Sequence, residues 1–320
     1  MILASQVWTQ VFWTSALAGG LIAGVPLMFT ALGEAISERA GVLNIGLEGM
    51  MLVGAYAGFL GTYYGHSTWL GYLAGIGAGM LASCFMVVLC VWLGLDQIVV
   101  GIAITLAGEG ITSVLYQSQF SSTQPRLGGV HTAPIPLLDR IPVLGRTING
   151  EYPLFSQPLL VYLGLAFAVL LAWVFRSTNV GLNLRAAGEK PEALDAAGIS
   201  VVATRSYAAL ATGALAGLGG AYLAIAGTGG FQDFLTQGQG FMAIVIAMLA
   251  RGRPIAVVVS SLLFGIALSF SGLLQIAGID LAPEVVHILP FAAIIVALML
   301  FARRAYLPPA LALPYVRGAR

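Results

Sequence analysis

Two glutamates lie inside apolar stretches of the sequence, where a carboxyl group is costly to bury. Glu48 is part of GVLNIGLEGMMLVGAYAGF and Glu109 is part of GIAITLAGEGITSVLYQ, and glycines flank both residues. Ionisable groups at membrane depth usually serve a function, and irregular backbone there is tolerated where it faces protein or a water-filled cavity. We interpret Glu48, with Asn44 before it, as lining a polar path or bracing a broken helix. The alternative is that each glutamate is hydrogen-bonded within a helix bundle or near an interface, and for Glu109 we favour this structural role.

A second candidate for chemistry is the charged segment GLNLRAAGEKPEALDAAGIS, residues 181–200, which contains five charges and the one lysine of the chain. Pro191 suits the first turn of a helix and Gly198 suits its C-terminal cap. The residues between them therefore predict a helix of about seven residues, roughly 10 Å long. A solvated loop needs neither the proline nor the cap, so we expect a rigid helix that fits a groove on a partner.

This short helix is expected to have two different faces. Leu194 and Ala197 share one face, three residues apart, and Glu192 and Asp195 share another, which Glu189 joins. The acidic residues lie near the helix N-terminus, where the helix dipole favours negative charge.

Signatures of catalysis and of metal binding are missing from the sequence. It has no G-x-x-x-x-G-K-[ST] phosphate loop, no Gly-x-Ser-x-Gly elbow and no His-Glu-x-x-His helix. The histidines His66, His131 and His287 are scattered and are expected at or beyond the outer face, so no metal site is predicted. Cys84 and Cys90 lie in an apolar run and are interpreted as small buried hydrophobic residues. We therefore expect no enzyme activity and no cofactor in this chain.

The composition places most of the chain in a membrane. Charged residues make up 8% of the chain, against roughly 25% in soluble domains, while 59% of the chain is hydrophobic and the mean hydropathy is +0.94. So few polar groups cannot cover the surface of a soluble fold of 320 residues. The net charge of +1 gives no basic field that would attract nucleic acid. The N-terminus MILASQVWTQ lacks a positive region, so we expect the first apolar run to remain as a helix.

The apolar runs predict an all-α bundle of about nine transmembrane helices, with eight to ten as the range, because a helix needs roughly 20 apolar residues to cross the hydrocarbon core. The spans are expected at 11–33, 46–64, 68–94, 97–119, 157–175, 201–227, 236–250, 254–276 and 285–302. The run near 236–250 is the weakest, since its apolar part FMAIVIAMLA has ten residues. It is either half of a discontinuous helix or, as we favour, an ordinary helix that starts near Leu235. In both cases its outer end is expected to face a polar space.

The basic residues predict the orientation of the chain. With residues 176–200 in the cytoplasm, eleven of the 14 lysines and arginines fall inside, and only Arg126, Arg140 and Arg146 fall outside. The N-terminus is then external and the C-terminus is cytoplasmic. We expect residues 1–320 to form a single transmembrane domain whose external segment, 120–156, is an ordered cap or a docking surface, with a flexible tether as the alternative. The proline-rich tail is expected to be a nonhelical cytoplasmic extension.

Two stripes of glycine predict close packing of helices. Gly71, Gly75 and Gly79 recur every four residues, and Gly213 and Gly217 do the same in a later span. Small residues on one helix face let two backbones approach each other. Packing is the favoured role, with contact to a solute as the alternative.

Three stretches of the chain carry motifs of a known family. They are PLMFTALGEAISERAGVLNIGLEGMMLVGA at 26–55, LRAAGEKPEALDAAGI at 184–199 and GQGFMAIVIAMLARGRP at 238–254. In order and spacing they resemble the permease subunits of bacterial ABC importers in the branched-chain amino acid, ribose and nucleoside group, and most closely the shorter permease of the nucleoside (basic membrane protein-type) importers. Lys190 stands where an asparagine is usual, and Gln239 stands where a basic residue is common.

The resemblance implies a complex in which different subunits carry out different steps of transport. Two permease chains form the solute pathway, two ATPase subunits that hold ATP and Mg²⁺ each grip a coupling helix, and an external solute-binding protein delivers the solute. The second permease is expected to be a paralogue, and the complex is expected in the bacterial inner membrane. The residues implied to contact or shape the ATPase socket are Gly188, Glu189, Lys190, Pro191, Glu192, Ala193, Asp195 and Gly198. The pathway candidates are Asn44, Glu48, Gly240 and Phe241.

Nucleosides are the solutes that the resemblance favours. The alternatives are a permease for a sugar or another small polar solute, a secondary transporter or channel that works alone, and a membrane scaffold or sensor. A secondary transporter predicts ion-coupling charges in corresponding halves of the chain, and a scaffold leaves the buried polar residues and the capped helix unexplained.

Overall fold

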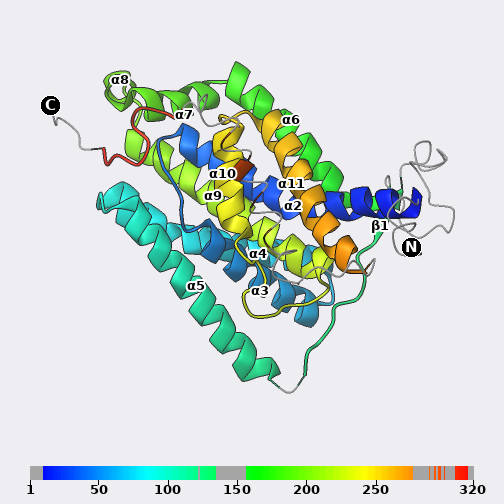
Figure 1. The fold of residues 1–320 in the computed structure, drawn as a ribbon. Helices are drawn as coiled ribbons and strands as arrows, with labels where there is room; N and C mark the ends of the chain where they lie inside the picture. Colours follow the sequence, from blue (N-terminus) through cyan, green and yellow to red (C-terminus); the bar gives the residue numbers. More distant parts are fainter. Residues whose placement is uncertain are drawn as a thin grey trace.

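The computed structural model describes residues 10–121, 123–134, 156–276 and 307–315, together with residues 288, 292, 295, 296 and 299. Within this part the chain consists of helices, turns and one pair of short strands, so the predicted all-α class is confirmed (Figure 1). The expected span at 285–302 lies mostly outside the described residues.

Apart from two helices that lie in the charged segment, the helices follow the order of the apolar runs. They are α2 (Gln10–Arg39), α3 (Leu47–Gly65), α4 (Thr68–Met86) with a π-helical end η1 (Val87–Trp92), α5 (Gln97–Phe120), α6 (Leu159–Ser177), α7 (Asn179–Glu189), α8 (Pro191–Ala196), α9 (Val201–Tyr222) with a π-helical end η2 (Leu223–Gly227), α10 (Gln239–Leu249) and α11 (Pro254–Ile276). Five described stretches are long and apolar enough to cross a membrane, namely Ala16–Arg39, Thr68–Trp92, Gln97–Phe120, Leu159–Ser177 and Val201–Gly227. The chain is therefore a polytopic membrane protein.

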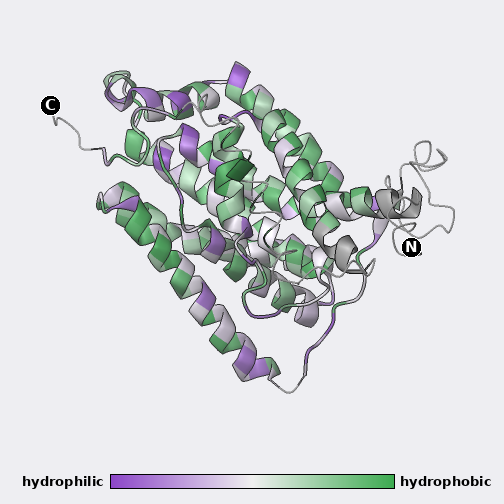
Figure 2. Ribbon diagram, in the orientation of Figure 1, coloured by the Kyte–Doolittle hydropathy of each residue, from purple (hydrophilic) through white to green (hydrophobic). Residues whose placement is uncertain are grey.

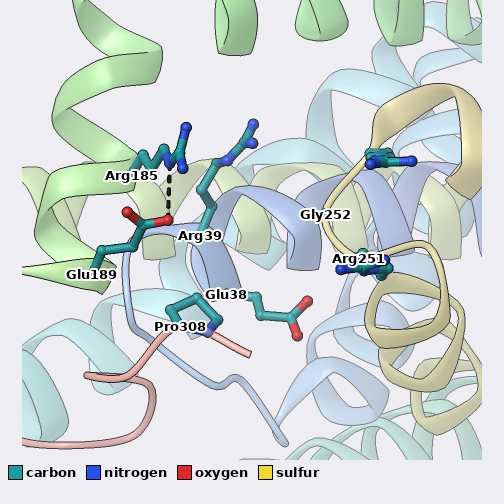
Figure 3. Close-up of a pocket in the computed structure, with 8 residues that line it drawn as sticks. Glu38, Arg39, Arg185, Glu189, Arg251, Gly252 and Pro308 are labelled. Carbon is teal, nitrogen blue, oxygen red and sulfur yellow. Dashed lines mark hydrogen bonds and ion pairs between the residues drawn. The ribbon is translucent and has the colours of Figure 1, made fainter. Parts of the chain in front are cut away.

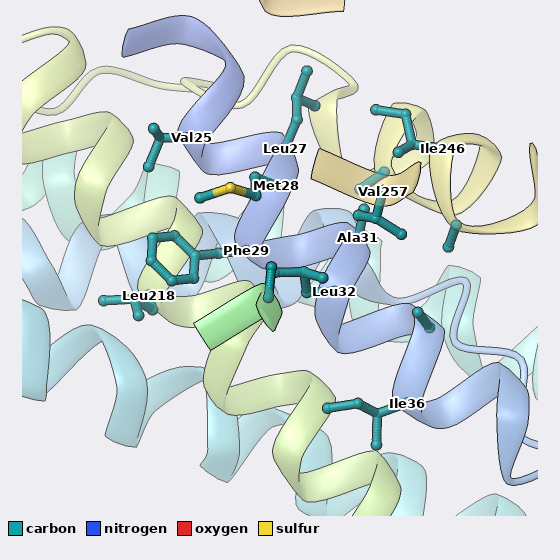
Figure 4. Close-up of a cluster of buried hydrophobic side chains, with 14 of the residues drawn as sticks. Val25, Leu27, Met28, Phe29, Ala31, Leu32, Ile36, Leu218, Ile246 and Val257 are labelled. Carbon is teal, nitrogen blue, oxygen red and sulfur yellow. The ribbon is translucent and has the colours of Figure 1, made fainter. Parts of the chain in front are cut away.

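Helices α2 and α9 form the centre of the bundle. In their most apolar windows 72% and 78% of the residues are buried, against 33% in the windows of α4, α5 and α6. Helix α9 packs against α2, α3 and α4, while α11 runs along α2. The largest buried cluster joins α2 to its neighbours, as Figure 4 shows for Phe29 and Leu218 on one side and Ile246 and Val257 on the other.

The two predicted glycine stripes meet where α4 packs on α9. A Cβ atom on Gly217 would lie 2.9 Å from the Cα of Gly79, and one on Gly75 would lie 3.0 Å from the Gly217 carbonyl oxygen. Gly213 approaches the backbone of Gly79 in the same contact, and Gly71 packs on α3. Because the atoms opposite are backbone atoms, a larger side chain would separate the helices.

The outward faces of α4, α5 and α6 are apolar (Figure 2). Phe85, Leu106 and Val169 are each more than 60% exposed, which suits contact with lipid or with another membrane chain. Cys84 lies on this outer surface, so its predicted burial is wrong, whereas Cys90 is buried. The neighbouring Ser83 is the residue that turns toward α9, where its hydroxyl donates a hydrogen bond of 2.6 Å to the Ala209 carbonyl.

Helix α10 does not start near Leu235, so the favoured interpretation of the span at 236–250 is wrong. The helix begins at Gln239, directly after Gly238, whose φ of 83° lies in the left-handed region. Its 11 residues rise about 16 Å, roughly half of the hydrocarbon core. This geometry is that of a half-helix, the alternative considered from the sequence.

The described ends of the segment 120–156, which is predicted to be external, are ordered. Strand β1 (Thr132–Pro134) pairs antiparallel with β2 (Ser156–Pro158). Before β1, the amide of Leu127 donates a hydrogen bond of 2.8 Å to the Gly229 carbonyl beyond α9. The two ends are thus held together and to the bundle, and residues 135–155 lie outside the described part.

Candidate functional site

The carboxylate of Glu48 caps the N-terminus of α10. Its Oε1 accepts hydrogen bonds from the Thr236 hydroxyl at 2.5 Å and the Gly238 amide at 2.7 Å, and its Oε2 accepts one from the Gly240 amide at 2.6 Å. Free amides and a positive dipole make a helix N-terminus a good site for an anion. Glu48 belongs to the first turn of α3, so one side chain joins the starts of two helices.

A second buried carboxylate holds the connection that precedes α3. The Glu34 Oε1 atom on α2 accepts the Asn44 amide at 3.0 Å, and the Asn44 side chain accepts the Gly46 amide at 3.1 Å. Gln97, the first residue of α5, accepts the amide of Leu43 at 2.8 Å. These bonds satisfy backbone donors that have no helical partner, and they fix the turn from which Glu48 projects.

The pathway candidates differ in their surroundings. Asn44 and Gly240 are buried and Glu48 is 3% exposed. Glu48 and Gly240 meet at the closed junction between α3 and α10, whereas Asn44 lies in the connection before α3. A Cβ on Gly240 would lie 2.5 Å from the Glu48 Cα atom, which explains the need for glycine. Phe241 follows on the free face of α10 and is 42% exposed.

The predicted short helix is present as α8, with Pro191 in its first turn and Gly198 at φ 81° beyond its end. Leu194 is buried, whereas Glu192 and Ala193 are exposed and Asp195 is half-buried. Ala197 is also exposed, so the expectation that it shares the face of Leu194 is wrong. The helix ends at Ala196, and Ala197 is its C-cap.

Helix α7, which leads into α8, was not predicted. The sequence pattern that could have predicted it is a threonine suited to an N-cap, Thr178, followed by an amphipathic stretch. In the structure the Thr178 hydroxyl accepts a hydrogen bond of 3.3 Å from the Gly181 amide. Glu189 ends this helix and forms an ion pair of 2.9 Å with Arg185, four residues earlier. Gly188 is buried against the backbone of Arg39, so the segment is docked tightly on the end of α2.

Lys190 occupies the junction of α7 and α8 and is the N-cap residue of α8. It makes no side-chain capping bond, because an ammonium group has donors and no acceptor. The asparagine that the family resemblance leads one to expect carries an acceptor that suits an N-cap. The departure from the family pattern therefore removes one capping interaction from α8.

Arg205 in the first turns of α9 is a structural residue that sequence reasoning missed. Its buried guanidinium donates to four backbone carbonyls: Nε to Ala40 at 3.2 Å, Nη1 to Leu313 at 2.7 Å, and Nη2 to Ala187 at 3.2 Å and Ala310 at 3.3 Å. The Ala40 carbonyl follows α2, the Ala187 carbonyl belongs to α7, and the carbonyls of Ala310 and Leu313 lie in the C-terminal tail. The signal available in the sequence was an arginine five residues into an apolar span.

The described part of the tail, residues 307–315, is nonhelical, as predicted. It lies against α7 and the end of α2: the Ala310 amide donates to the Gly188 carbonyl at 3.0 Å, and the Ala312 amide donates to the Gly41 carbonyl at 3.1 Å. Tyr315 packs near Leu194 of α8. The tail is therefore part of the surface that carries α8.

Two of the histidines are not scattered in space. His66 and His131 both line a cavity of about 780 Å³, which Arg126 also lines, beside the α3–α4 turn and β1. Among the described residues, no group of three histidine, cysteine or acidic side chains is placed to hold a metal ion. His287 lies outside the described part.

Comparison with known proteins places the chain among transport proteins. A family model described as "Branched-chain amino acid transport system / permease component" matches residues 16–298. The chain is 34% identical over 314 residues to the nucleoside ABC transporter permease protein NupC of Lactococcus lactis, a match that covers 94% of this chain and 96% of NupC. It is 33% identical over 310 residues to the guanosine ABC transporter permease protein NupQ of Bacillus subtilis, with coverage of 94% and 96%.

A sugar transport protein also matches. The chain is 35% identical over 249 residues to the putative glucose ABC transporter permease protein TsgC13 of Haloferax volcanii, which covers 76% of this chain and 73% of TsgC13. The matches from L. lactis and B. subtilis each include a second permease protein, NupB and NupP, at 28% and 26% identity. No solved structure matches the chain.

Proposed function

The chain belongs to the family of permease components of branched-chain amino acid transport systems, and we propose that it is a permease subunit of an ATP-driven importer for nucleosides. The observation that carries this proposal is the similarity to nucleoside and guanosine permeases over nearly the whole chain. The apolar bundle supplies the membrane-spanning part, while ATP and Mg²⁺ are held by a separate ATPase subunit.

The ATPase binds at the coupling segment, residues 176–200. Glu192 and Ala193 project from α8 while Leu194 anchors the helix to the bundle. Pro191 and Gly198 set the start and the end of the helix, and Gly188 seats the preceding helix on α2. Arg205 of α9 binds the carbonyls of Ala40, after α2, and Ala187, in α7. A movement of α8 and α7 is therefore transmitted to α2 and α9 at the centre of the bundle.

Other partners follow from the remaining surfaces. A second permease, of the kind paired with NupC and NupQ, packs on the apolar outer surface and completes the solute pathway. Phe241 on the free face of α10 is our candidate for the wall of that pathway. A solute-binding protein docks on the external side, over the segment that contains β1 and β2, and the complex lies in the bacterial inner membrane.

A sugar is the second candidate solute, because the putative glucose permease is as similar in identity as the nucleoside permeases. The match to it covers 76% of this chain, whereas the matches to NupC and NupQ cover 94%. We therefore favour nucleosides.

Reconstitution in proteoliposomes with the second permease, the ATPase and the binding protein tests the proposal. We expect guanosine, and not glucose, to stimulate ATP hydrolysis and to accumulate inside when the binding protein and ATP are supplied on the appropriate sides. Stimulation by glucose alone would assign a sugar importer. Transport by this chain without any ATPase, driven by an ion gradient, would overturn the proposal.

A further inference from the structure

A cavity lined by four arginines lies at the end of the bundle that carries α7 and α8 (Figure 3). It has a volume of about 210 Å³, so it holds a group much larger than a single water. Its charged lining comes from three separate elements: Glu38 and Arg39 of α2, Arg185 and Glu189 of α7, and Arg251 and Arg253 of the turn between α10 and α11.

The charges of this cavity are not balanced. Glu189 pairs with Arg185 at 2.9 Å, and Glu38 is buried with both carboxyl oxygens lacking a hydrogen bond in the described part of the chain. Among the described residues Arg251 and Arg253 form no ion pair, and the tight turn that carries them has φ 56° at Arg251 and φ 60° at Gly252. The arginines therefore outnumber the carboxylates and leave a positive pocket.

The surroundings of the cavity are those of a membrane surface. Helix α7 buries Gly181 and Leu184 but exposes Val180 and Leu182, which are 60% and 63% accessible. A short helix that buries one face and exposes both apolar and charged side chains suits the interface between lipid and water. Arg39 is stacked 4.2 Å over the ring of Phe175 near the end of α6, a helix whose outer face is apolar. The positive pocket thus opens beside the lipid-facing surface.

We propose that this cavity binds the phosphate headgroup of an anionic phospholipid of the cytoplasmic leaflet. Guanidinium groups bind phosphate through charge-assisted hydrogen bonds, and basic pockets between transmembrane helices on the cytoplasmic side suit anionic headgroups. The acyl chains then lie along α6 and α7. The proposal goes beyond the transport function and takes from it only the cytoplasmic orientation of this end.

The site also suggests a role for the lipid. One phosphate group would contact the end of α2, α7 of the coupling segment and the turn that follows the half-helix α10 at the same time. A bound headgroup therefore holds these three elements in one arrangement.

Native mass spectrometry of the detergent-purified permease complex tests the site with two probes of equal chain length, phosphatidylglycerol and phosphatidylcholine. We expect tighter binding of phosphatidylglycerol, weakened about tenfold or more by Arg251→Gln and, separately, by Arg253→Gln. The matched control is Arg176→Gln, which removes one exposed arginine at the end of α6 outside the cavity lining, and should change binding less than about threefold. If one pocket variant fails to fold, the other still decides.

Four results would overturn the proposal. The first two are equal affinity for the two lipids and equal weakening of binding by all three variants. The third is displacement of the lipid by millimolar inorganic phosphate, which would assign the pocket to a free anion. The fourth is exclusion of phosphatidylglycerol by the bound ATPase, which would assign the pocket to a protein contact. None of these depends on which solute is transported, so failure of the lipid site is distinguishable from failure of the transport proposal.

Discussion

Glu48 binds the first turn of α10 through Gly240, whose amide donates a hydrogen bond of 2.6 Å to the Oε2 atom of the glutamate. The two residues are 192 positions apart in the sequence. A buried carboxylate of α3 thereby supplies the cap that the half-helix α10 cannot supply for itself, because Gly238 at its N-cap has no side chain.

Glu48→Ala should destabilise the protein strongly. It leaves the Thr236 hydroxyl and the amides of Gly238 and Gly240 without their acceptor, and each unsatisfied buried donor costs about 1–3 kcal/mol. We expect a loss of about 3 kcal/mol or more, measured as a lower midpoint of thermal unfolding in detergent. Glu109→Ala, which changes a half-buried glutamate of α5, is the control, and an equally small effect of both changes would contradict the capping role.

Gly217→Ala should loosen the contact between α4 and α9. The new methyl group would lie 2.9 Å from the Gly79 Cα atom, and the backbone opposite cannot rotate away. Gly77→Ala is the matched control, because a Cβ at Gly77 on α4 meets nothing within 4 Å and alanine favours a helix by about 1 kcal/mol. We expect a lower unfolding midpoint for Gly217→Ala and an unchanged or higher one for Gly77→Ala. The reverse order would disprove close packing at this contact.

Arg205→Lys should release the C-terminal tail although the positive charge is kept. A lysine ammonium is a compact group without the planar fork that serves four carbonyls at once. We expect hydrogen exchange of residues 307–315 to become faster and ATPase association to weaken, with the helices of the bundle still protected. Arg176→Lys serves as control, and unchanged exchange of the tail in Arg205→Lys would show that other contacts hold it.

Glu192→Arg combined with Asp195→Arg should abolish association with the ATPase and leave the chain folded in the membrane. Both side chains lie on α8, and Glu192 is exposed, so the reversal changes a docking surface and not the core. Co-purification with the ATPase measures the effect. Asp233→Arg, on the connection between α9 and α10, should leave co-purification unchanged, and full association of the double variant would remove the coupling role from α8.

Lys190→Asn should stabilise α8 by about 1 kcal/mol, because asparagine is a preferred N-cap and lysine has no acceptor. Slower hydrogen exchange of residues 191–197 is the expected signature. Lys190→Gln removes the same charge without a preferred cap, so an equal effect of both variants would point to charge and not to capping.

Features that depend on local pattern could be predicted from the sequence. Long apolar runs with few charges must be helices in a membrane, because lipid offers no partner for backbone polar groups. The short helix α8 followed from Pro191 and Gly198, which act on their own stretch of backbone. The two glycine stripes were visible because a helix repeats every 3.6 residues, although the sequence did not say which helices they join.

Features that depend on distant partners were decided only by the tertiary structure. The length of α10 was mispredicted because its cap comes from Glu48, 188 to 192 residues away from the groups it binds. The role of Arg205 depends on three groups of carbonyls, one after α2, one in α7 and one in the tail. The arginine cavity is lined by side chains from α2, α7 and the α10–α11 turn. The sequence by itself determined the apolar helices and the place of the short helix α8, since hydrophobicity and helix capping act locally. Which buried polar groups meet was left to the packing of the bundle, because a hydrogen bond needs two groups that folding alone brings together.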